Sequence, residues 1–175
     1  EWHNWSNLRQ KGKGVCLYNE FTPANLWVRN HHGLSCSEWT EALKMTANVS
    51  PVRALPGRSQ DSTRCRRCSE IETLPHVLGF CPFGELLRNV RHHNIRSSIA
   101  TALRERGYTV HEEVHGLANN GSNRRIDLLV MKPPEKKGYI LDPTVRFESH
   151  NSQPAEVDEE KRTIYIPTVD YYKNL

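Results

Sequence analysis

The chain has 175 residues, of which 37% are hydrophobic and 25% charged, and its formal net charge is +4. This composition excludes a disordered tail, and no apolar run approaches the length needed to cross a membrane. Basic side chains are in excess over residues 1–110, whereas residues 111–175 carry slightly more acidic than basic side chains. Such a basic amino-terminal part favours a phosphate-bearing partner, which makes nucleic acid the first class to consider.

The five cysteines indicate a reducing compartment. Their number is odd and no segment has the pattern of a secretory signal peptide, so we do not expect a disulfide framework. Cys16 and Cys36 lie away from the others and are predicted to be free, partly buried thiols. The chain begins at Glu1 without a Met, and we expect a fragment or processed product that works inside the cell.

Residues 1–60 are predicted to be a linker region that contains helices. Ser35 or Ser37 is placed to cap a helix that continues to Met45, before Pro51 breaks the pattern. All of the Trp residues lie here, and we interpret them as packing anchors rather than as platforms for stacked bases. They are Trp2, Trp5, Trp27 and Trp39.

Residues 61–84 contain a predicted zinc site. The ligands follow the spacing Cys-x2-Cys-x7-His-x4-Cys and are Cys65, Cys68, His76 and Cys81. Three thiolates and one imidazole form a tetrahedral zinc set, whereas ordinary buried cysteines rarely fall at these gaps around a His. Three arginines flank the first two ligands and are candidates for nucleic-acid contact, namely Arg64, Arg66 and Arg67.

A long helix is predicted to follow Gly84 and to end at Gly107. Its apolar stripe has helical spacing and consists of Leu87, Val90, Ile95, Ile99, Ala102 and Leu103. The helix is also rich in Arg. A basic helix face is usually only solvated, but its position directly after a metal knuckle favours phosphate contact.

Beyond the helix the pattern becomes extended. Strands are predicted over residues 108–114, 126–131 and 139–145, with a turn at 119–123 between the first two. A helix is expected over 155–165, and residues 166–175 are expected to be irregular. Together these elements predict an α/β fold over residues 85–175, with a small mixed sheet flanked by helices.

Two carboxylates occupy strand positions where they are disfavoured. Asp127 opens one apolar strand and Asp142 interrupts the next, although an ionised carboxylate is costly to bury without a partner. An antiparallel return would bring both to the same end of the sheet, where Mg²⁺ or Mn²⁺ could relieve their repulsion. The alternative is structural: Asp127 would pair with Arg124 or Arg125, and Asp142 would cap a turn before Pro143.

Three further side chains complete a candidate active site. Glu113, near the end of the first strand, could add a third carboxylate. Lys161 and Tyr165 lie four residues apart on a predicted helix and therefore project from one face. A Lys beside metal-bound water can position or deprotonate that water and stabilise charge on a phosphate. This set is typical of metal-assisted phosphodiester hydrolysis.

These motifs resemble the carboxy-terminal part of polyproteins from site-specific non-LTR retrotransposons, the class with a restriction-like endonuclease downstream of its reverse transcriptase. The knuckle with its long Cys-to-His gap matches that family, as does the stretch Glu72-Thr73-Leu74-Pro75-His76. The family's Arg-His-Asn element matches at Arg91 and His92, but its third position is His93 here.

The likeness extends to the nuclease, which is similar to the PD-(D/E)xK fold. Its first Asp maps to Asp127, although Ile126 replaces the usual Pro, and its second acid maps to Asp142. An ordinary restriction-type site would have Lys where this chain has Thr144; in the retrotransposon class the Lys lies on a later helix with Tyr four residues on. Lys161 and Tyr165 match that arrangement, and the family's strand glutamate maps to Glu113.

The resemblance implies a nuclear, metal-dependent DNA endonuclease that nicks a duplex to leave a 3′-hydroxyl for priming reverse transcription. It implies structural Zn²⁺, catalytic Mg²⁺ or Mn²⁺, and a parent reverse transcriptase polyprotein. The side chains expected to face nucleic acid are Arg64, Arg66, Arg67, Arg91, His92, Arg124 and Arg125. The sequence does not determine the target site. It also leaves open whether the knuckle binds DNA or element RNA, and whether a homodimer cuts both strands.

Two other functions fit the same sequence. The chain could be a nucleic-acid-binding module that no longer cuts, with the carboxylates as relics; the departures at Ile126 and His93 support this alternative. It could also be a structural adaptor that uses the knuckle to bind protein. The salt dependence of nucleic-acid affinity distinguishes the adaptor from the other two functions. Phosphate contacts release counterions and weaken steeply as ionic strength rises, so an affinity that barely responds to salt would indicate the adaptor.

Overall fold

A computed structural model of the chain describes residues 2–9, 11–15, 17–20, 22–30, 33–57, 61–133, 135 and 137–174. Cys16 and the side chain of Trp2 lie outside the described residues, so the predictions for them are not addressed. The chain folds as two compact units, Glu1–Glu85 with Arg146–Gln153 and Leu86–Val145 with Pro154–Leu175. In the part of the chain so described, no helix is both long and apolar enough to cross a membrane.

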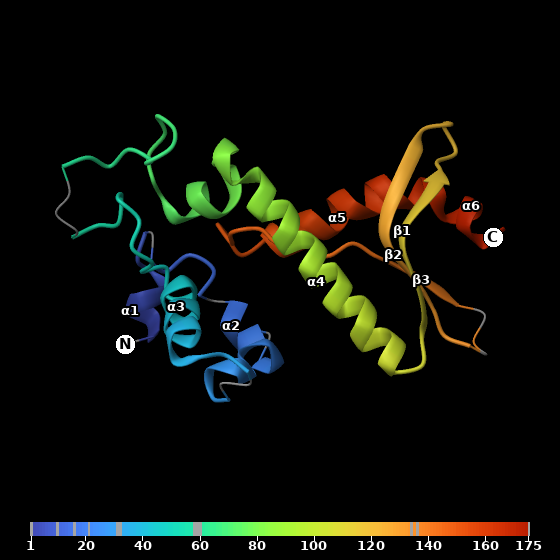
Figure 1. Ribbon diagram of the computed structural model, residues 1–175, viewed down its shortest axis with the longest axis horizontal. Helices are drawn as coiled ribbons and strands as arrows, with labels where there is room; N and C mark the ends of the chain where they lie inside the picture. Colours follow the sequence, from blue (N-terminus) through green and yellow to red (C-terminus); the bar gives the residue numbers. More distant parts are fainter. Residues whose placement is uncertain are drawn as a thin grey trace. The chain divides into compact units, whose positions relative to one another are not determined.

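The first unit is helical before the knuckle, as predicted (Figure 1). Its elements are α1 (Trp2–Ser6), α2 (Leu17–Glu20), the 3-10 helix η1 (Thr22–Val28) and α3 (Cys36–Thr46). Helix α3 begins where Ser35 accepts a hydrogen bond from the Glu38 amide and Glu38 accepts one from the Ser35 amide. This capping box satisfies amides that the first turn leaves free, and it confirms Ser35 as the cap.

Three tryptophans of this unit, Trp5, Trp27 and Trp39, are half-buried, and two of them also donate hydrogen bonds through their indole N–H groups. Trp5 donates to the Lys11 carbonyl at 3.0 Å and Trp39 to the Trp27 carbonyl at 3.4 Å. These contacts agree with a packing role. Cys36, in contrast, is exposed. The prediction of a partly buried thiol was wrong there, because Cys36 starts α3 on its solvent side.

The second unit contains a long helix and a three-stranded sheet. Helix α4 (Glu85–Glu105) ends before Gly107, whose φ of +82° suits glycine. Strands β1 (Thr109–Leu117), β2 (Asn123–Met131) and β3 (Gly138–Leu141) follow in that order across the sheet. Both pairings are antiparallel. The predicted α/β class with a small sheet and helices is confirmed, although every pairing between these strands is antiparallel rather than mixed.

The third strand is shorter than predicted. It ends at Leu141, whereas the sequence pattern extended it to Val145. Pro143 accounts for the difference, because a proline cannot donate a hydrogen bond to a strand ladder. Asp142 therefore lies directly beyond the last paired residue of the strand.

The carboxy-terminal segment is more regular than predicted. Helix α5 (Gln153–Tyr165) is followed by the 3-10 helix η4 (Ile166–Thr168) and the short helix α6 (Val169–Lys173). Residues expected to be irregular are thus mostly helical. Tyr172 of α6 explains this order, since its hydroxyl donates to the Val114 carbonyl of β1 and lies over Gly116. A Cβ at Gly116 would lie 2.4 Å from that hydroxyl, so any other residue there would displace the Tyr172 ring.

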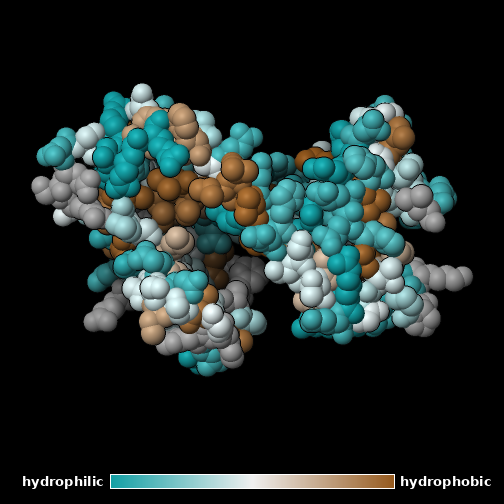
Figure 2. Space-filling model, in the orientation of Figure 1, coloured by the Kyte–Doolittle hydropathy of each residue, from teal (hydrophilic) through white to brown (hydrophobic). Residues whose placement is uncertain are grey.

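A small core joins one face of the sheet to α4. Its buried members are Ala100, Val110, Leu128 and Val130, with Ile99, Leu103 and Tyr108 packed against them. Only the later turns of α4 take part. Leu87 and Val90 are 73% and 47% exposed, so the first part of the predicted apolar stripe is not core. Hydrophobic surface also gathers in the first unit around the π-helical turn η2 (His76–Phe80) and the 3-10 helix η3 (Pro82–Gly84), before α4 begins (Figure 2).

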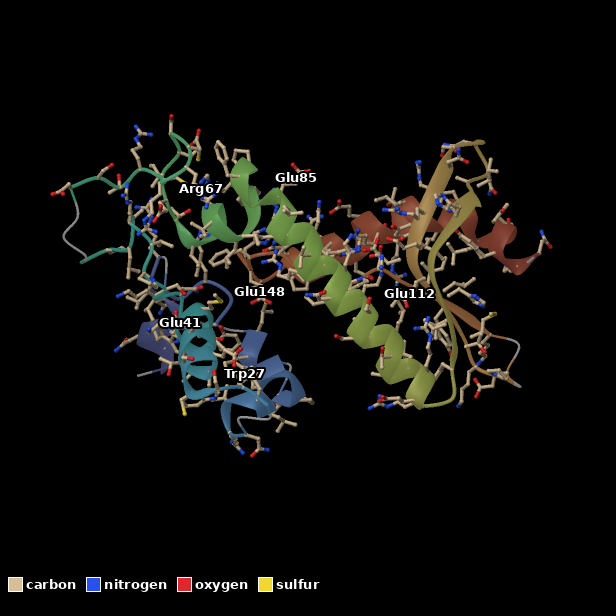
Figure 3. The ribbon with its side chains drawn as sticks, viewed as in Figure 1. Trp27, Glu41, Arg67, Glu85, Glu112 and Glu148 are labelled. Carbon is tan, nitrogen blue, oxygen red and sulfur yellow. The ribbon has the colours of Figure 1, made fainter. Side chains whose placement is uncertain are left out.

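Arg96 is the polar link between α4 and the sheet. Its side chain is 11% exposed and pairs with Glu112 and Glu113, neighbours on β1. Glu112, labelled in Figure 3, also pairs with Arg104 at 3.0 Å. A buried guanidinium needs such partners, and removing it would leave Glu113 without its closest cation and Glu112 with Arg104 alone.

We expect Arg96→Ala to lower the free energy of unfolding by roughly 1–3 kcal/mol, since both carboxylates would lose a largely buried partner. Chemical denaturation measures this change. Arg106→Ala is the matched control, because Arg106 is exposed, lies just beyond α4 and donates to the Ala102 carbonyl of that helix rather than to a carboxylate of the sheet. Equal losses in the two variants would contradict the role assigned to Arg96.

Candidate metal-binding and active sites

The Cys/His cluster is built by a tight turn and a short helix. An isolated bridge pairs Arg64 with Ile71, and the Cys65 amide donates to the Glu70 carbonyl at 2.7 Å, which closes the turn that carries the first two cysteines. His76 opens η2 (His76–Phe80), a π-helical turn, and Cys81 follows it and donates its amide to the His76 carbonyl at 2.7 Å. Local backbone bonds thus bring both halves of the motif together.

The ligand atoms have the spacing of a tetrahedral site. One atom from each of the four residues lies within 4.8 Å of all the others. Cys65 Sγ is 4.0 Å from Cys81 Sγ, and Cys68 Sγ is 3.2 Å from His76 Nε2. Bonds of about 2.3 Å to zinc place neighbouring sulfurs about 3.8 Å apart. The cluster therefore could hold zinc and fits a zinc knuckle.

The backbone around the cluster favours the thiolate form of Cys65. The Arg67 amide donates to Cys65 Sγ at 3.4 Å, and this hydrogen bond is the main cause that lowers the Cys65 pKa to about 6. Zinc binds thiolate rather than thiol. The hydrogen bond from the Arg67 amide therefore favours the form of Cys65 that binds zinc.

The buried carboxylate of Glu72 stabilises the knuckle through hydrogen bonds from backbone amides. Its side chain is 2% exposed and accepts bonds from the Arg53 and Arg66 amides, each at 3.0 Å. The Arg66 guanidinium lies 3.0 Å from the same carboxylate. Sequence reasoning gave Glu72 no role, although a Glu four residues before the ligand His in a basic segment was a usable signal.

The three arginines near the knuckle are exposed, but two of them have internal contacts. Arg66 pairs with Glu72, and Arg64 donates to the Ser69 carbonyl at 2.7 Å. Arg67, labelled in Figure 3, lies on the turn between the two cysteines. Their predicted contact with nucleic acid stays a prediction.

We expect metal analysis to find about one Zn²⁺ per chain, and Cys68→Ser or Cys81→Ser to abolish tight binding because a tetrahedral set loses a soft ligand. Cys36→Ser is the matched control, since Cys36 is exposed on α3 and is not part of the cluster. Full zinc content in the Cys81→Ser protein would contradict the assigned ligand set.

Glu72→Gln should weaken zinc binding by about tenfold or more, the usual scale for groups that hold metal ligands in place. A neutral amide cannot pair with Arg66 and accepts the two backbone bonds less strongly. Competition with a chromophoric chelator measures the affinity. Glu70→Gln changes an exposed neighbour and should leave it unaltered; equal weakening in both variants would show a nonspecific charge effect.

The second site lies across the sheet of the other unit. In the register, Leu128 pairs with Leu141, and Glu112 and Val114 pair with Leu128 and Ile126. One position beyond the pair of Leu128 and Leu141, Asp127 lies close enough to Asp142 for the charge of Asp142 to raise the Asp127 pKa, whereas the β1–β2 ladder passes over Glu113. The two aspartates therefore lie at the same level of the sheet, as the sequence-based proposal requires.

Helix α5 brings two hydrogen-bond donors to Asp142. Lys161 Nζ lies 2.9 Å from Asp142 Oδ2, and the Tyr165 hydroxyl, one turn later, donates to the same oxygen. The Asp142 side chain is 9% exposed and that of Lys161 27%. Burial, and then the hydrogen bond to Asp142, raises the pKa of Tyr165, so its hydroxyl stays protonated and remains a donor.

Asp127 is the unsatisfied member of the pair. Its Oδ2 is buried and makes no hydrogen bond of good geometry, although His92 Nε2 lies 3.2 Å away. Burial raises the pKa of Asp127, and the charge of Asp142 adds to this shift. The expected alternative of pairing with Arg124 or Arg125 is not seen: Arg125 lies 4.0 Å from Glu113, and Arg124 donates to the Asn123 carbonyl.

These features fit a divalent cation at the acidic site. A buried carboxylate oxygen without a donor, beside a second carboxylate, is the arrangement that a hard cation stabilises. Among the described residues, only the Cys/His cluster gathers three or more ligand atoms within 4.8 Å. The acidic site thus offers fewer protein ligands, and Mg²⁺ typically keeps several waters beside one or two carboxylates.

Glu113 pairs with Arg96, and in the described part of the chain no hydrogen bond joins it to either aspartate. Its φ is +53°, a left-handed conformation that is uncommon for residues other than glycine. Its carboxylate bonds the Arg96 guanidinium, and that bond is the main cause that lowers the Glu113 pKa. No contact with the cation position supports the predicted assistance from Glu113, which stays a prediction.

A pocket opens beside the acidic site within this unit. Its volume is about 960 Å³, and it lies between β2–β3 and the α5–α6 segment. Asp142, Lys161 and Tyr165 line it together with apolar residues of the sheet and helices. These three side chains can therefore be reached from solvent.

Comparison with known proteins finds similar sequences in the Pol polyproteins of R2 retrotransposable elements. A retrovirus-related Pol polyprotein from the type-1 retrotransposable element R2 of Popillia japonica is 26% identical over 153 residues, which is 86% of this chain and 31% of that protein. Another from the same organism is 30% identical over 105 residues, 59% of this chain and 15% of the protein. One from Nasonia vitripennis is 29% identical over 147 residues, which is 81% of this chain and 14% of that protein. The chain spans less than a third of these relatives, and no protein-family model matches it.

Proposed function

We propose, from the premise that the homologues of this chain are R2 retrotransposon Pol polyproteins, that it is the DNA endonuclease region of such a polyprotein. In this proposal it nicks target DNA and leaves a 3′-hydroxyl that primes reverse transcription by the parent enzyme. The homology supports a retrotransposon Pol protein. The cutting activity is inferred from the acidic site.

One observation carries the proposal: Asp127 and Asp142 meet across β2 and the end of β3, and Lys161 and Tyr165 of α5 both bond Asp142. Two largely buried acids with an amine and a phenol form the set used for metal-assisted hydrolysis, and Asp142, Lys161 and Tyr165 of this set line a pocket.

Each side chain has a distinct task in the proposed reaction. A bound Mg²⁺ or Mn²⁺ would supply a more acidic water and would stabilise charge on the phosphate oxygens. Asp127 and Asp142 would hold the ion. Lys161 would hold the attacking water and neutralise developing negative charge. Tyr165 would fix the Asp142 carboxylate in position through its hydroxyl.

The basic side chains would hold the DNA. Arg91 on α4 and Arg124 and Arg125 on β2 belong to the same unit as the acidic site. Zinc in the knuckle would order a second basic element for DNA or element RNA. Genomic target DNA as substrate would place the protein in the nucleus, and a second copy would cut the other strand.

A plasmid-nicking assay of the zinc-loaded protein tests the activity. We expect Asp127→Asn and Asp142→Asn to lose nicking on the order of 100-fold or more, since each removes charge that holds the ion. Asp170→Asn is the matched control, because Asp170 lies on α6 of the same unit, is 71% exposed and pairs with Lys173. Its nicking should equal that of the unaltered chain.

Undiminished nicking by both site variants, at matched purity, would remove the assignment. The alternative of a binding module without catalysis makes the opposite prediction. In that case, no nicking would occur in Mg²⁺ or Mn²⁺, and nucleic-acid binding would survive treatment with EDTA at a concentration that leaves zinc in place.

A further inference from the structure

We propose that His92 is a third protein ligand of the divalent ion at the acidic site and that it raises the affinity for Mn²⁺ relative to Mg²⁺. This inference rests on the proposed function, because it concerns the ion held by Asp127 and Asp142. The sequence pattern had placed His92 at the DNA backbone. The structure instead places its Nε2 3.2 Å from Asp127 Oδ2.

The geometry favours a shared ion over a hydrogen bond. Asp127 Oδ2 is buried and has no hydrogen bond of good geometry, although the imidazole nitrogen is within reach. A His whose task was to donate to this oxygen would satisfy it. Adjacent ligands of an octahedral ion, with bonds of about 2.1 Å, lie roughly 3 Å apart. The separation of Nε2 and Oδ2 suits two atoms that point at a common cation.

The helix that carries His92 is fixed relative to the sheet. Arg96 lies one turn later on α4, and its pairs with Glu112 and Glu113 hold this part of the helix against β1. The His93 ring packs edge-on against that of His92 with centroids 5.5 Å apart, and its Nδ1 lies 4.0 Å from Glu113. His92 is therefore positioned by contacts that do not involve DNA.

His92 remains accessible to an ion that enters from solvent. Its side chain is 33% exposed, whereas that of Asp127 is 16% exposed. The described ligand atoms of His92, Asp127 and Asp142 are not all within 4.8 Å of one another. Binding therefore requires a small rotation of the exposed imidazole toward Asp142, which its exposure permits.

The chemistry of imidazole sets the metal preference. Mg²⁺ favours oxygen ligands and keeps its waters, whereas imidazole nitrogen suits later and softer divalent ions. A site with two carboxylates alone would discriminate little between Mg²⁺ and Mn²⁺. Replacing one water by His92 would strengthen Mn²⁺ binding selectively.

Pulsed electron paramagnetic resonance of Mn²⁺ bound to the zinc-loaded chain tests the ligand directly, without DNA or turnover. We expect coupling of the electron spin to an imidazole ¹⁴N in the unaltered chain. His92→Ala and His92→Gln should remove this coupling and weaken Mn²⁺ binding by at least about tenfold. Mg²⁺ affinity should change less.

His111→Ala is the matched control, since His111 is an exposed histidine on β1 of the same unit. It should keep both the coupling and the Mn²⁺ affinity. The Gln variant preserves side-chain volume, and equal thermal unfolding of all variants verifies that each is folded.

Two results would overturn the inference and separate it from the proposed function. Bound Mn²⁺ without ¹⁴N coupling, or coupling that survives in His92→Ala, would show that His92 is not a ligand, while nicking that depends on Asp127 would leave the endonuclease intact. Absence of any Mn²⁺ binding together with absence of nicking would overturn both.

Discussion

The hydrogen bonds from Lys161 and Tyr165 to one oxygen of Asp142 are the interaction on which the acidic site depends. The strand ladder ends at Leu141, and Pro143 prevents its continuation. Asp142 would otherwise sit at a frayed strand end. The two donors from α5 fix it in a largely buried position at the level of Asp127. Helix α5, from a later part of the chain, thus completes the acidic site whose two aspartates come from β2 and the end of β3.

Much of this arrangement could be predicted because it depends on local chemistry. The Ser35 cap, the ends of α4 and the ligand spacing of the knuckle follow from a few neighbouring residues. The pairing of the two aspartates was predictable for another reason: Asp is disfavoured in strands, so two of them in apolar runs indicated a common partner. The register then brought them together.

Other features depend on contacts that no local pattern contains. Helix α6 is ordered by Tyr172 against Gly116 of β1, far away in the sequence. Glu72 directly follows two exposed residues, Glu70 and Ile71, yet its own carboxylate is buried and bonded by three donors. The left-handed backbone of Glu113 and the approach of His92 to Asp127 result from how α4 meets the sheet. Periodicity predicts which face a residue occupies, but it does not predict its partner.

Arg96 explains why the acidic site can be open. Glu112, Glu113, Asp127 and Asp142 would together place four negative charges near one row of the sheet. Arg96 pairs with the first two, and the field of Asp127 also favours its charged form. The unbalanced negative charge is thereby confined to Asp127 and Asp142, and Lys161 balances part of it. A site with this little excess charge would bind a divalent ion without enclosing it, which leaves room for water, for the imidazole of His92 and for a phosphate.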